Sequence, residues 1–292
     1  MHFLKYHALG NDYIVLNPAD FGSQLEPSQI KLICRRNYGV GSDGILWGPL
    51  DTTECDFELR IFNPDGSEAE KSGNGLRIFS RYLWDRELVR EEPFTILTAG
   101  GKVRCQVQVG GRTVTVEMGN VSFDSSLIPV EGTSREVIDE TMDINGQKFR
   151  FCAATIGNPH CVILRDEVCA DESQKLGPII ENDPRFPNRT NVQFMKILNR
   201  NNIKIEIWER GAGYTLASGS SSCAAAAVAY RLGFCDSEIA VHMPGGIIDI
   251  TVSDDFSISM IGPVTKIAEG TFFSEMFDQA LLNFFQFNGD RN

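Results

Sequence analysis

Two stretches of the sequence follow the same plan and lie 146 residues apart, which is half of the 292-residue chain. Residues 62–77 read FNPDGSEAEKSGNGLR, and residues 208–223 read WERGAGYTLASGSSSC. In each stretch the end of a strand-like segment is followed by a Gly-rich turn and then by Ser-Gly at the start of a helix. A repeat at a fixed offset is typical of an internal duplication. The sequence therefore predicts two domains of like fold.

The two expected helix starts suit the binding of an anion. Ser72 opens the first of them, SGNG, and Ser218 opens the second, SGSS. Small side chains leave the unpaired backbone N–H groups accessible at the positive end of the helix dipole, where a carboxylate or phosphate can bind. Two such ends could hold one anion together. The alternative is that Ser72 and Ser218 are ordinary N-caps with no ligand.

A second repeated feature is a Gly-Asn pair between two strand-like segments. Asn11 follows Gly10 between FLKYHAL and YIVLN, and Asn158 follows Gly157 between FCAATI and CVIL, at an offset of 147 residues. Polar residues between alternating segments predict tight turns. Because the two turns occupy equivalent places in the duplication, we expect them to share a role.

The remaining pattern predicts an α+β fold. Periodic apolar residues and turn signals predict helices over 27–38, 75–88, 172–175, 220–233 and 272–287, and a hairpin turn at Gly110-Gly111. The Ala-rich helix 220–233 should be buried. We expect two pseudo-symmetric domains, each a curled, mainly antiparallel sheet around a central helix, with the ligand site between them. The polar segment 118–150 suggests a junction, so the predicted domains are 1–120, completed by 266–292, and 121–265.

Composition and charge exclude several classes of function. The net charge is −12 and no basic cluster is present, which argues against binding of nucleic acid or of anionic membranes. No apolar run approaches the ~20 residues that span a bilayer, and the N-terminus lacks the features of a signal peptide, so a cytoplasmic location is expected. The eight cysteines form no C-x-x-C pair, so no metal site and no cofactor is expected.

Six runs in fixed order, HALGNDYIV, NPDGSEAE, GNGLR, IGNPHCV, TNVQF and ERGAG, resemble those of the diaminopimelate epimerase family. The resemblance implies that family's two-domain fold and an epimerase that needs no pyridoxal cofactor. In the family, one cysteine precedes GNG and another precedes the second Gly-Ser/Thr, and the two thiols act as base and acid on opposite faces of one carbon. In this chain both positions are serine, Ser72 and Ser218.

The resemblance also implies roles for further residues. It places four residues in acid/base chemistry or its tuning, namely Ser72, Ser218, His160 and Glu209. Residues that match the backbone pairs holding the reacting carboxylate are Gly73, Asn74, Gly219 and Ser220. Residues that match those holding the distal, non-reacting end of the substrate are Asn11, Asn63, Asn158, Asn191 and Arg210. The implied ligand is a small amino acid with two ends. The resemblance also implies a homodimer, although the family usually dimerises through an aromatic residue and this chain has Ala268 at that position.

Serine is a poor replacement for cysteine as an acid/base group. A hydroxyl has a pKa about 7 units above that of a thiol, a deficit on the order of 10 kcal/mol for a general base. Only a partner base could offset this, and His160 and Glu209 are the candidates. Three hypotheses stay open. The chain is a diaminopimelate-type epimerase whose cysteines are replaced, an isomerase that uses other groups on another small acid, or a binding protein that has lost catalysis.

Overall fold

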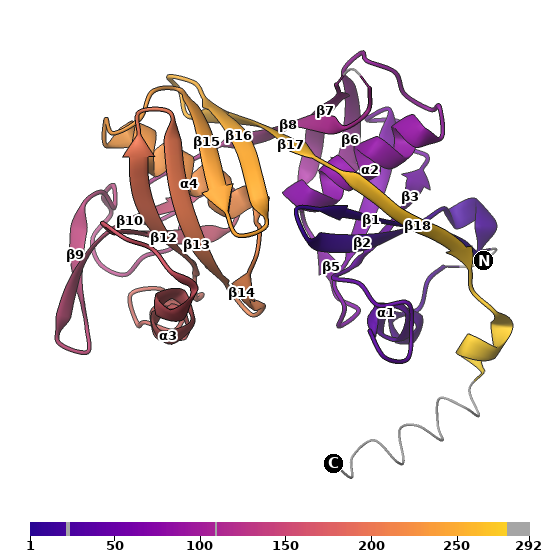
Figure 1. Cartoon of the computed structure of the whole chain (residues 1–292), viewed down its shortest axis with the longest axis horizontal. Coiled ribbons are helices and arrows are strands. Elements are labelled where there is room, and N and C mark those ends of the chain that lie inside the picture. Colours follow the sequence, from indigo (N-terminus) through magenta and orange to yellow (C-terminus); the bar gives the residue numbers. More distant parts are fainter. Residues whose placement is uncertain (22–23, 109, 279–292) are drawn as a thin grey trace, which may run out of the picture.

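The computed structural model of this chain describes residues 1–21, 24–108 and 110–278. The described part forms two lobes side by side, each with strands wrapped around one long helix (Figure 1). The helix is α2 in the N-terminal lobe and α4 in the C-terminal lobe. The predicted α+β fold with two domains of similar design is confirmed.

Among its described residues, the N-terminal half contains eight strands and two α-helices. In chain order they are β1 (His2–Ala8), β2 (Asn11–Leu16), α1 (Pro27–Cys34), β3 (Ile45–Leu50), β4 (Phe57–Phe62), β5 (Glu68–Ala69), α2 (Gly73–Asp85), β6 (Phe94–Thr98), β7 (Gly101–Val107) and β8 (Thr113–Asn120).

The second half continues with a similar order of elements. They are β9 (Glu140–Ile144), β10 (Gln147–Thr155), β11 (Pro159–Leu164), α3 (Ala170–Glu181), β12 (Asn191–Asn199), β13 (Asn202–Glu209), β14 (Gly213–Thr215), α4 (Gly219–Arg231), β15 (Glu238–Met243), β16 (Gly246–Val252), β17 (Ser257–Pro263) and β18 (Thr265–Thr271).

The pairing of the strands repeats from one half to the other, as the duplication predicts. Strands β1, β2, β3 and β4 pair antiparallel, parallel and antiparallel in turn, and β10, β11, β12 and β13 do the same. The parallel pair β4–β6 corresponds to β13–β15. The halves are joined where β8 pairs with β17 and where β18 pairs with β1. Residues 265–271 therefore lie in the sheet of the N-terminal half.

Both central helices are largely buried, α2 through its apolar side chains and α4 because its side chains are small on nearly every face. In α2, Leu76, Phe79 and Leu83 recur at helical spacing and have no exposed surface. In α4, the run of four alanines at 224–227 is also fully buried, and the short side chains let the surrounding strands approach closely. The prediction that this helix lies at the centre of its domain is confirmed.

Some local predictions differ from the structure. The segment 118–150, interpreted as a junction, contains the hairpin β9–β10, whose turn is Asn145-Gly146 with both φ angles positive. Strand β15 was not predicted, and the expected helix 172–175 is the longer α3. The hairpin turn at Gly110-Gly111 is confirmed, with φ of 81° and 72°. The domain bounds themselves stay predictions.

The helix predicted over 272–287 lies largely outside the described residues. Within the described part, residues 274–277 form a short 3-10 helix, and Phe272 is buried against Phe3 with ring centroids 4.7 Å apart. No helix among the described residues is long and apolar enough to cross a bilayer.

Candidate active site

Ser72 is the N-cap of α2. Its backbone is extended, with φ of −139° and ψ of 116°, and its Oγ accepts a hydrogen bond of 3.0 Å from the backbone N–H of Gly75. This is the ordinary geometry of a serine cap, and it satisfies one of the unpaired N–H groups of the first turn. The capping role that the sequence allowed for Ser72 is confirmed.

Ser218 stands in the same relation to α4. Its backbone is extended, and its Oγ accepts a hydrogen bond of 3.4 Å from the backbone N–H of Ser221. The two helix starts meet: a Cβ added to Gly219 would lie 3.5 Å from the Cα of Gly73, and the side chain of Met260 packs against both glycines. The positive ends of both helix dipoles thus converge on one point. A carboxylate there would be attracted by both helices.

The two Gly-Asn turns each contact the helix start of their own domain. Asn74 donates from Nδ2 to Oδ1 of Asn11 at 2.9 Å, and Asn158 donates from Nδ2 to Oγ of Ser220 at 3.4 Å. Asn11 in turn donates to a carboxylate oxygen of Asp43 at 2.9 Å. The duplication therefore extends from the backbone to the side chains that surround the two serines.

Glu209, at the end of β13, lies beside Ser218. Burial raises the pKa of Glu209 above its ordinary value of 4.5, hydrogen bonds from the side chains of Ser218 and Thr215 lower it in part, and the charge of Asp43 raises it again. A carboxylate bonded to a serine hydroxyl can take the proton of that hydroxyl while the serine takes one from a ligand. Glu209 is thus placed to serve Ser218 as a partner base.

Tyr13, on β2, was not predicted as a site residue. Its hydroxyl lies 3.2 Å from Oγ of Ser72, and its side chain is buried. Burial raises the pKa of Tyr13 to about 12, and the charges of Glu209 and Asp43 act in the same direction. The sequence held one signal for it, because Tyr13 stands 147 residues before His160, at the offset of the Gly-Asn turns.

His160, on β11, is fully buried and bonded through both ring nitrogens. Its Nε2 lies 2.9 Å from Oδ1 of Asn158, and its Nδ1 lies 3.1 Å from Nε2 of Gln193. Gln193 also donates to Oγ of Ser221 at 3.0 Å. Burial, and then the charge of Arg210, lower the pKa of His160 to about 3. At neutral pH the ring is therefore uncharged.

The depressed pKa of His160 predicts a pH-dependent loss of stability. In the unfolded chain the imidazole binds a proton near pH 6.5, whereas the folded chain holds it neutral down to about pH 3. Acidification between these values therefore favours the unfolded state, by about 1.4 kcal/mol per pH unit. The raised pKa of Glu209 acts in the opposite sense.

The measurement is the free energy of unfolding between pH 7 and pH 4, in the wild type and in His160→Gln. Both chains keep Glu209, so the difference between the two curves isolates His160. We expect the wild type to lose more stability on acidification than His160→Gln. Parallel curves would show that His160 titrates normally in the folded chain.

Three of the five residues assigned to the distal end of a substrate differ in what their side chains contact. Asn191 is committed to the fold, because Nδ2 donates to Pro159 O at 2.9 Å and Oδ1 accepts from the N–H of Arg210 at 2.9 Å. The Arg210 side chain is exposed and donates from Nη1 to the carbonyl of Asn188 at 3.0 Å. The side chain of Asn63 donates to Oγ of Ser67 within its own turn at 3.0 Å.

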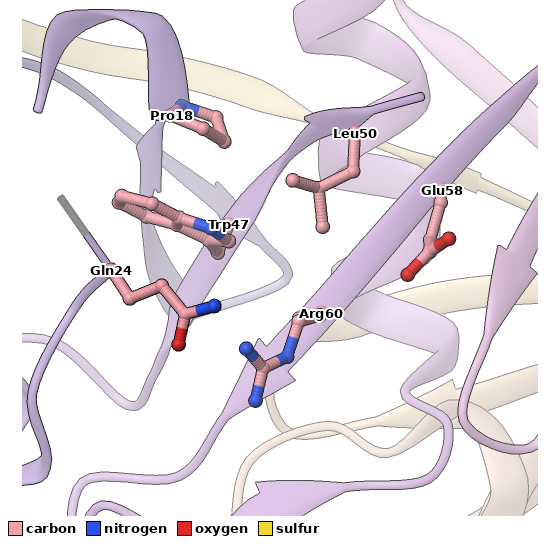
Figure 2. Close-up of a pocket in the computed structure, with 6 residues that line it drawn as sticks. All are labelled: Pro18, Gln24, Trp47, Leu50, Glu58 and Arg60. Atoms are coloured by element: carbon pink, nitrogen blue, oxygen red, sulfur yellow. The ribbon is translucent and has the colours of Figure 1, made fainter. Parts of the chain in front are cut away.

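Other parts of the molecule offer less chemistry. A hollow of about 400 Å³ in the N-terminal domain contains none of the site residues (Figure 2) and is lined by Pro18, Gln24, Trp47, Leu50, Glu58 and Arg60. Among the described residues no cluster of three His, Cys, Asp or Glu side chains could hold a metal ion. Cys223, one turn into α4, is fully buried, and burial raises its pKa to about 12, so it is an unreactive core thiol.

The fold is shared with solved structures of enzymes that invert a carbon centre. A probable proline racemase from Agrobacterium radiobacter superposes with a TM-score of 0.69 at 14% identity, covering 95% of this chain and 94% of that one. A hydroxyproline epimerase from Agrobacterium vitis gives a TM-score of 0.68 at 15% identity, covering 96% and 92%. At such low identity the likeness concerns the fold alone, and it defines the structural class as this two-domain fold.

Sequence comparison identifies the family within that class. The family model described as diaminopimelate epimerase matches residues 3–123 and 152–267. Diaminopimelate epimerase 2 from Nostoc is 64% identical over 277 residues, which is 95% of this chain and 97% of that protein. Diaminopimelate epimerase from Moorella thermoacetica is 37% identical over 282 residues, 93% and 99% of the two chains. The chain belongs to the diaminopimelate epimerase family.

Proposed function

We propose that this chain epimerises diaminopimelate without a cofactor, with Ser72 and Ser218 on opposite faces of the α carbon. The observation that carries the proposal is the meeting of the two helix starts at Gly73 and Gly219. The N–H groups of Gly73, Asn74, Gly219 and Ser220 would hold the reacting carboxylate and stabilise the negative charge that develops as the α proton leaves.

The acid/base partners of the serines complete the proposal. Glu209 would act as a base through Ser218, because its carboxylate is partly buried beside that hydroxyl. His160 would act as a neutral group that orients Asn158 and, through Gln193, the first turn of α4. Asn11, Asn158 and Arg210 would hold the distal end of the substrate, with Asn191 fixing the backbone of Arg210.

The experiment is an assay of α-proton exchange in deuterium oxide with LL- and meso-diaminopimelate and a panel of simple amino acids. We expect exchange and inversion of diaminopimelate alone. Turnover of another acid in the panel, with diaminopimelate inert, would transfer the proposal to a different substrate. The homodimer and the cytoplasmic location stay predictions.

A second candidate is a binding protein of this family without turnover. The observation that favours it is that an aliphatic hydroxyl stands at both acid/base positions and caps a helix in each case. Calorimetry separates the two candidates in combination with the exchange assay. Binding of diaminopimelate with no exchange would favour the binding protein, whereas binding with exchange would favour the epimerase.

The distal carboxylate predicts a specific effect at Arg210. A guanidinium can bind a carboxylate through two parallel hydrogen bonds, whereas an ammonium group cannot reproduce that geometry. Arg210→Lys should therefore weaken the binding of diaminopimelate by roughly 1–3 kcal/mol, measured by calorimetry. The matched control is Arg200→Lys, an exposed arginine paired with Asp236 outside the site. Equal affinities in the two variants would place Arg210 outside the binding site.

A further inference from the structure

The two serines have chemically different partners. Ser218 lies beside the carboxylate of Glu209 and lowers the pKa of that carboxyl, whereas the Oγ of Ser72 lies 3.2 Å from the phenol of Tyr13. The position equivalent to Glu209 in the first half, at the offset of 146 residues, is Asn63, which cannot exchange a proton and is bonded to Ser67. The duplication thus supplies a carboxylate on one side of the site and a phenol on the other.

The surrounding backbone restricts the position of the Tyr13 ring. A Cβ added to Gly44 would lie 2.6 Å from Cε1 of Tyr13 and 2.7 Å from the carbonyl of Phe62, so a larger residue at position 44 would displace the ring. Tyr13 is only 8% exposed, and its hydroxyl shares a hydrogen bond with Oγ of Ser72. A buried phenol needs such a partner for its hydroxyl.

The hydrogen bonds around Ser72 allow an arrangement in which its own proton points to a ligand. The Oγ of Ser72 accepts from the N–H of Gly75 at 3.0 Å. A serine oxygen has a second lone pair, which can accept the O–H of Tyr13, and its single proton can then point elsewhere. In this arrangement a proton can pass from Tyr13 to Ser72 as Ser72 gives up its own.

We propose that Tyr13 supplies a proton to Ser72. The serine on one face of the site, Ser218, then has a carboxylate as its partner, and the serine on the other face, Ser72, has a phenol. The proposal rests on the proposed epimerase function. In the inversion step the Cα–H bond breaks on the Ser218 face. That proton goes to Oγ of Ser218 as the hydroxyl proton of Ser218 goes to Glu209. On the other face the hydroxyl proton of Ser72 goes to Cα as the phenolic proton of Tyr13 goes to Ser72.

The proton balance closes through solvent. The step leaves Glu209 protonated and Tyr13 as a phenolate, and a later transfer of one proton from Glu209 to Tyr13 through water restores the starting state. A phenol with a pKa of about 12 is a stronger acid than an aliphatic hydroxyl, whose pKa lies near the ~15.7 of water. Tyr13 thus makes Ser72 a better proton donor than a serine alone.

Unequal faces lead to a measurable consequence. On the Ser218 face the α proton can be removed and a solvent-derived deuteron returned through Glu209 without any contribution from Tyr13. Inversion, in contrast, requires that a proton is delivered to the α carbon from the Ser72 face. Removing the phenolic hydroxyl should therefore suppress inversion while leaving exchange with retention, for the isomer whose α hydrogen faces Ser218.

The test compares Tyr13→Phe with the wild type in deuterium oxide, with exchange and inversion followed separately for LL- and meso-diaminopimelate. We expect inversion to fall by about 100- to 10,000-fold, the usual contribution of a general acid. We expect exchange of one isomer, and the affinity measured by calorimetry, to change by no more than a few-fold. The matched control is Tyr6→Phe, a buried tyrosine whose hydroxyl bonds to Asp85 at 2.9 Å away from the site.

Three outcomes would overturn the relay. Equal inversion in the wild type and Tyr13→Phe would exclude it, and an equal fall in exchange and inversion would assign Tyr13 a structural role. A wild type that neither exchanges nor inverts diaminopimelate would overturn the proposed function itself. This result is distinct from the first two, in which the wild type is active. Should Tyr13→Phe fail to fold, 3-fluorotyrosine at position 13 keeps the hydroxyl and lowers its pKa. The relay then predicts that the alkaline limb of the inversion profile moves to lower pH, and an unmoved limb would contradict it.

Discussion

The double variant Ser72→Cys, Ser218→Cys is expected to exchange the α proton of diaminopimelate faster than the wild type by several orders of magnitude. A thiol has a pKa about 7 units below that of a hydroxyl, and the positive end of a helix lowers it further. Both helix starts already meet at Gly73 and Gly219, so the thiols would enter an existing geometry.

Each single cysteine variant should gain much less than the double variant. Inversion needs a base on one face and an acid on the other, so one thiol supports exchange with retention but little inversion, and the two effects should be strongly non-additive. The matched control is Ser80→Cys, which introduces a thiol at a fully buried position in the middle of α2, where the hydroxyl donates to the carbonyl of Leu76 at 2.8 Å, and it should leave exchange at the wild-type rate. An inert double variant that still binds diaminopimelate would mean that the two positions do not face its α carbon.

The second large effect is expected at Glu209. Glu209→Gln keeps the size and polarity of the side chain but removes its ability to take a proton from Ser218. Exchange of the α proton should fall by about 100- to 10,000-fold in the wild-type serine background, with little change in the affinity for diaminopimelate. The control is Glu206→Gln, a buried carboxylate on the same strand that accepts a hydrogen bond from Tyr214 at 2.7 Å.

The pH profile of exchange gives an independent check on Glu209. Because the folded pKa of Glu209 lies above its ordinary value of 4.5, the carboxylate needed as a base should be lost at a higher pH than an exposed glutamate would allow. The acid limb of the wild-type profile should therefore lie above pH 4.5 and disappear in Glu209→Gln. If the acid limb of the profile is unchanged in Glu209→Gln, a group other than Glu209 is responsible for it.

The sequence predicted the helix starts and the Gly-Asn turns because their signals are local. Ser-Gly before a periodic apolar segment specifies a capped helix within a few residues, and the observed caps at Ser72 and Ser218 follow from that rule. The duplication then related the two halves without any knowledge of their contacts. The central position of α4 was predictable for the same reason, since an alanine run has no polar face to expose.

Tyr13 could not be predicted in the same way because its contact is distant along the chain. A tyrosine in an alternating strand is indistinguishable from a core residue, and its partner Ser72 lies 59 residues further on. The same holds for β15, whose parallel pairing with β13 depends on residues 38 positions apart. The hydrogen bond of Asn63 to Ser67 within its own turn could not be predicted either, because a turn asparagine and a ligand-binding asparagine have the same sequence pattern.

The central claim, that Ser72 and Ser218 lie on opposite faces of one α carbon, is tested most directly by a crystal structure of this chain with meso-diaminopimelate bound. We expect one carboxylate between the first turns of α2 and α4, the α carbon between the two serine hydroxyls, and the distal carboxylate against Arg210. A ligand bound elsewhere, or bound with both serine hydroxyls on the same side of the α carbon, would contradict it.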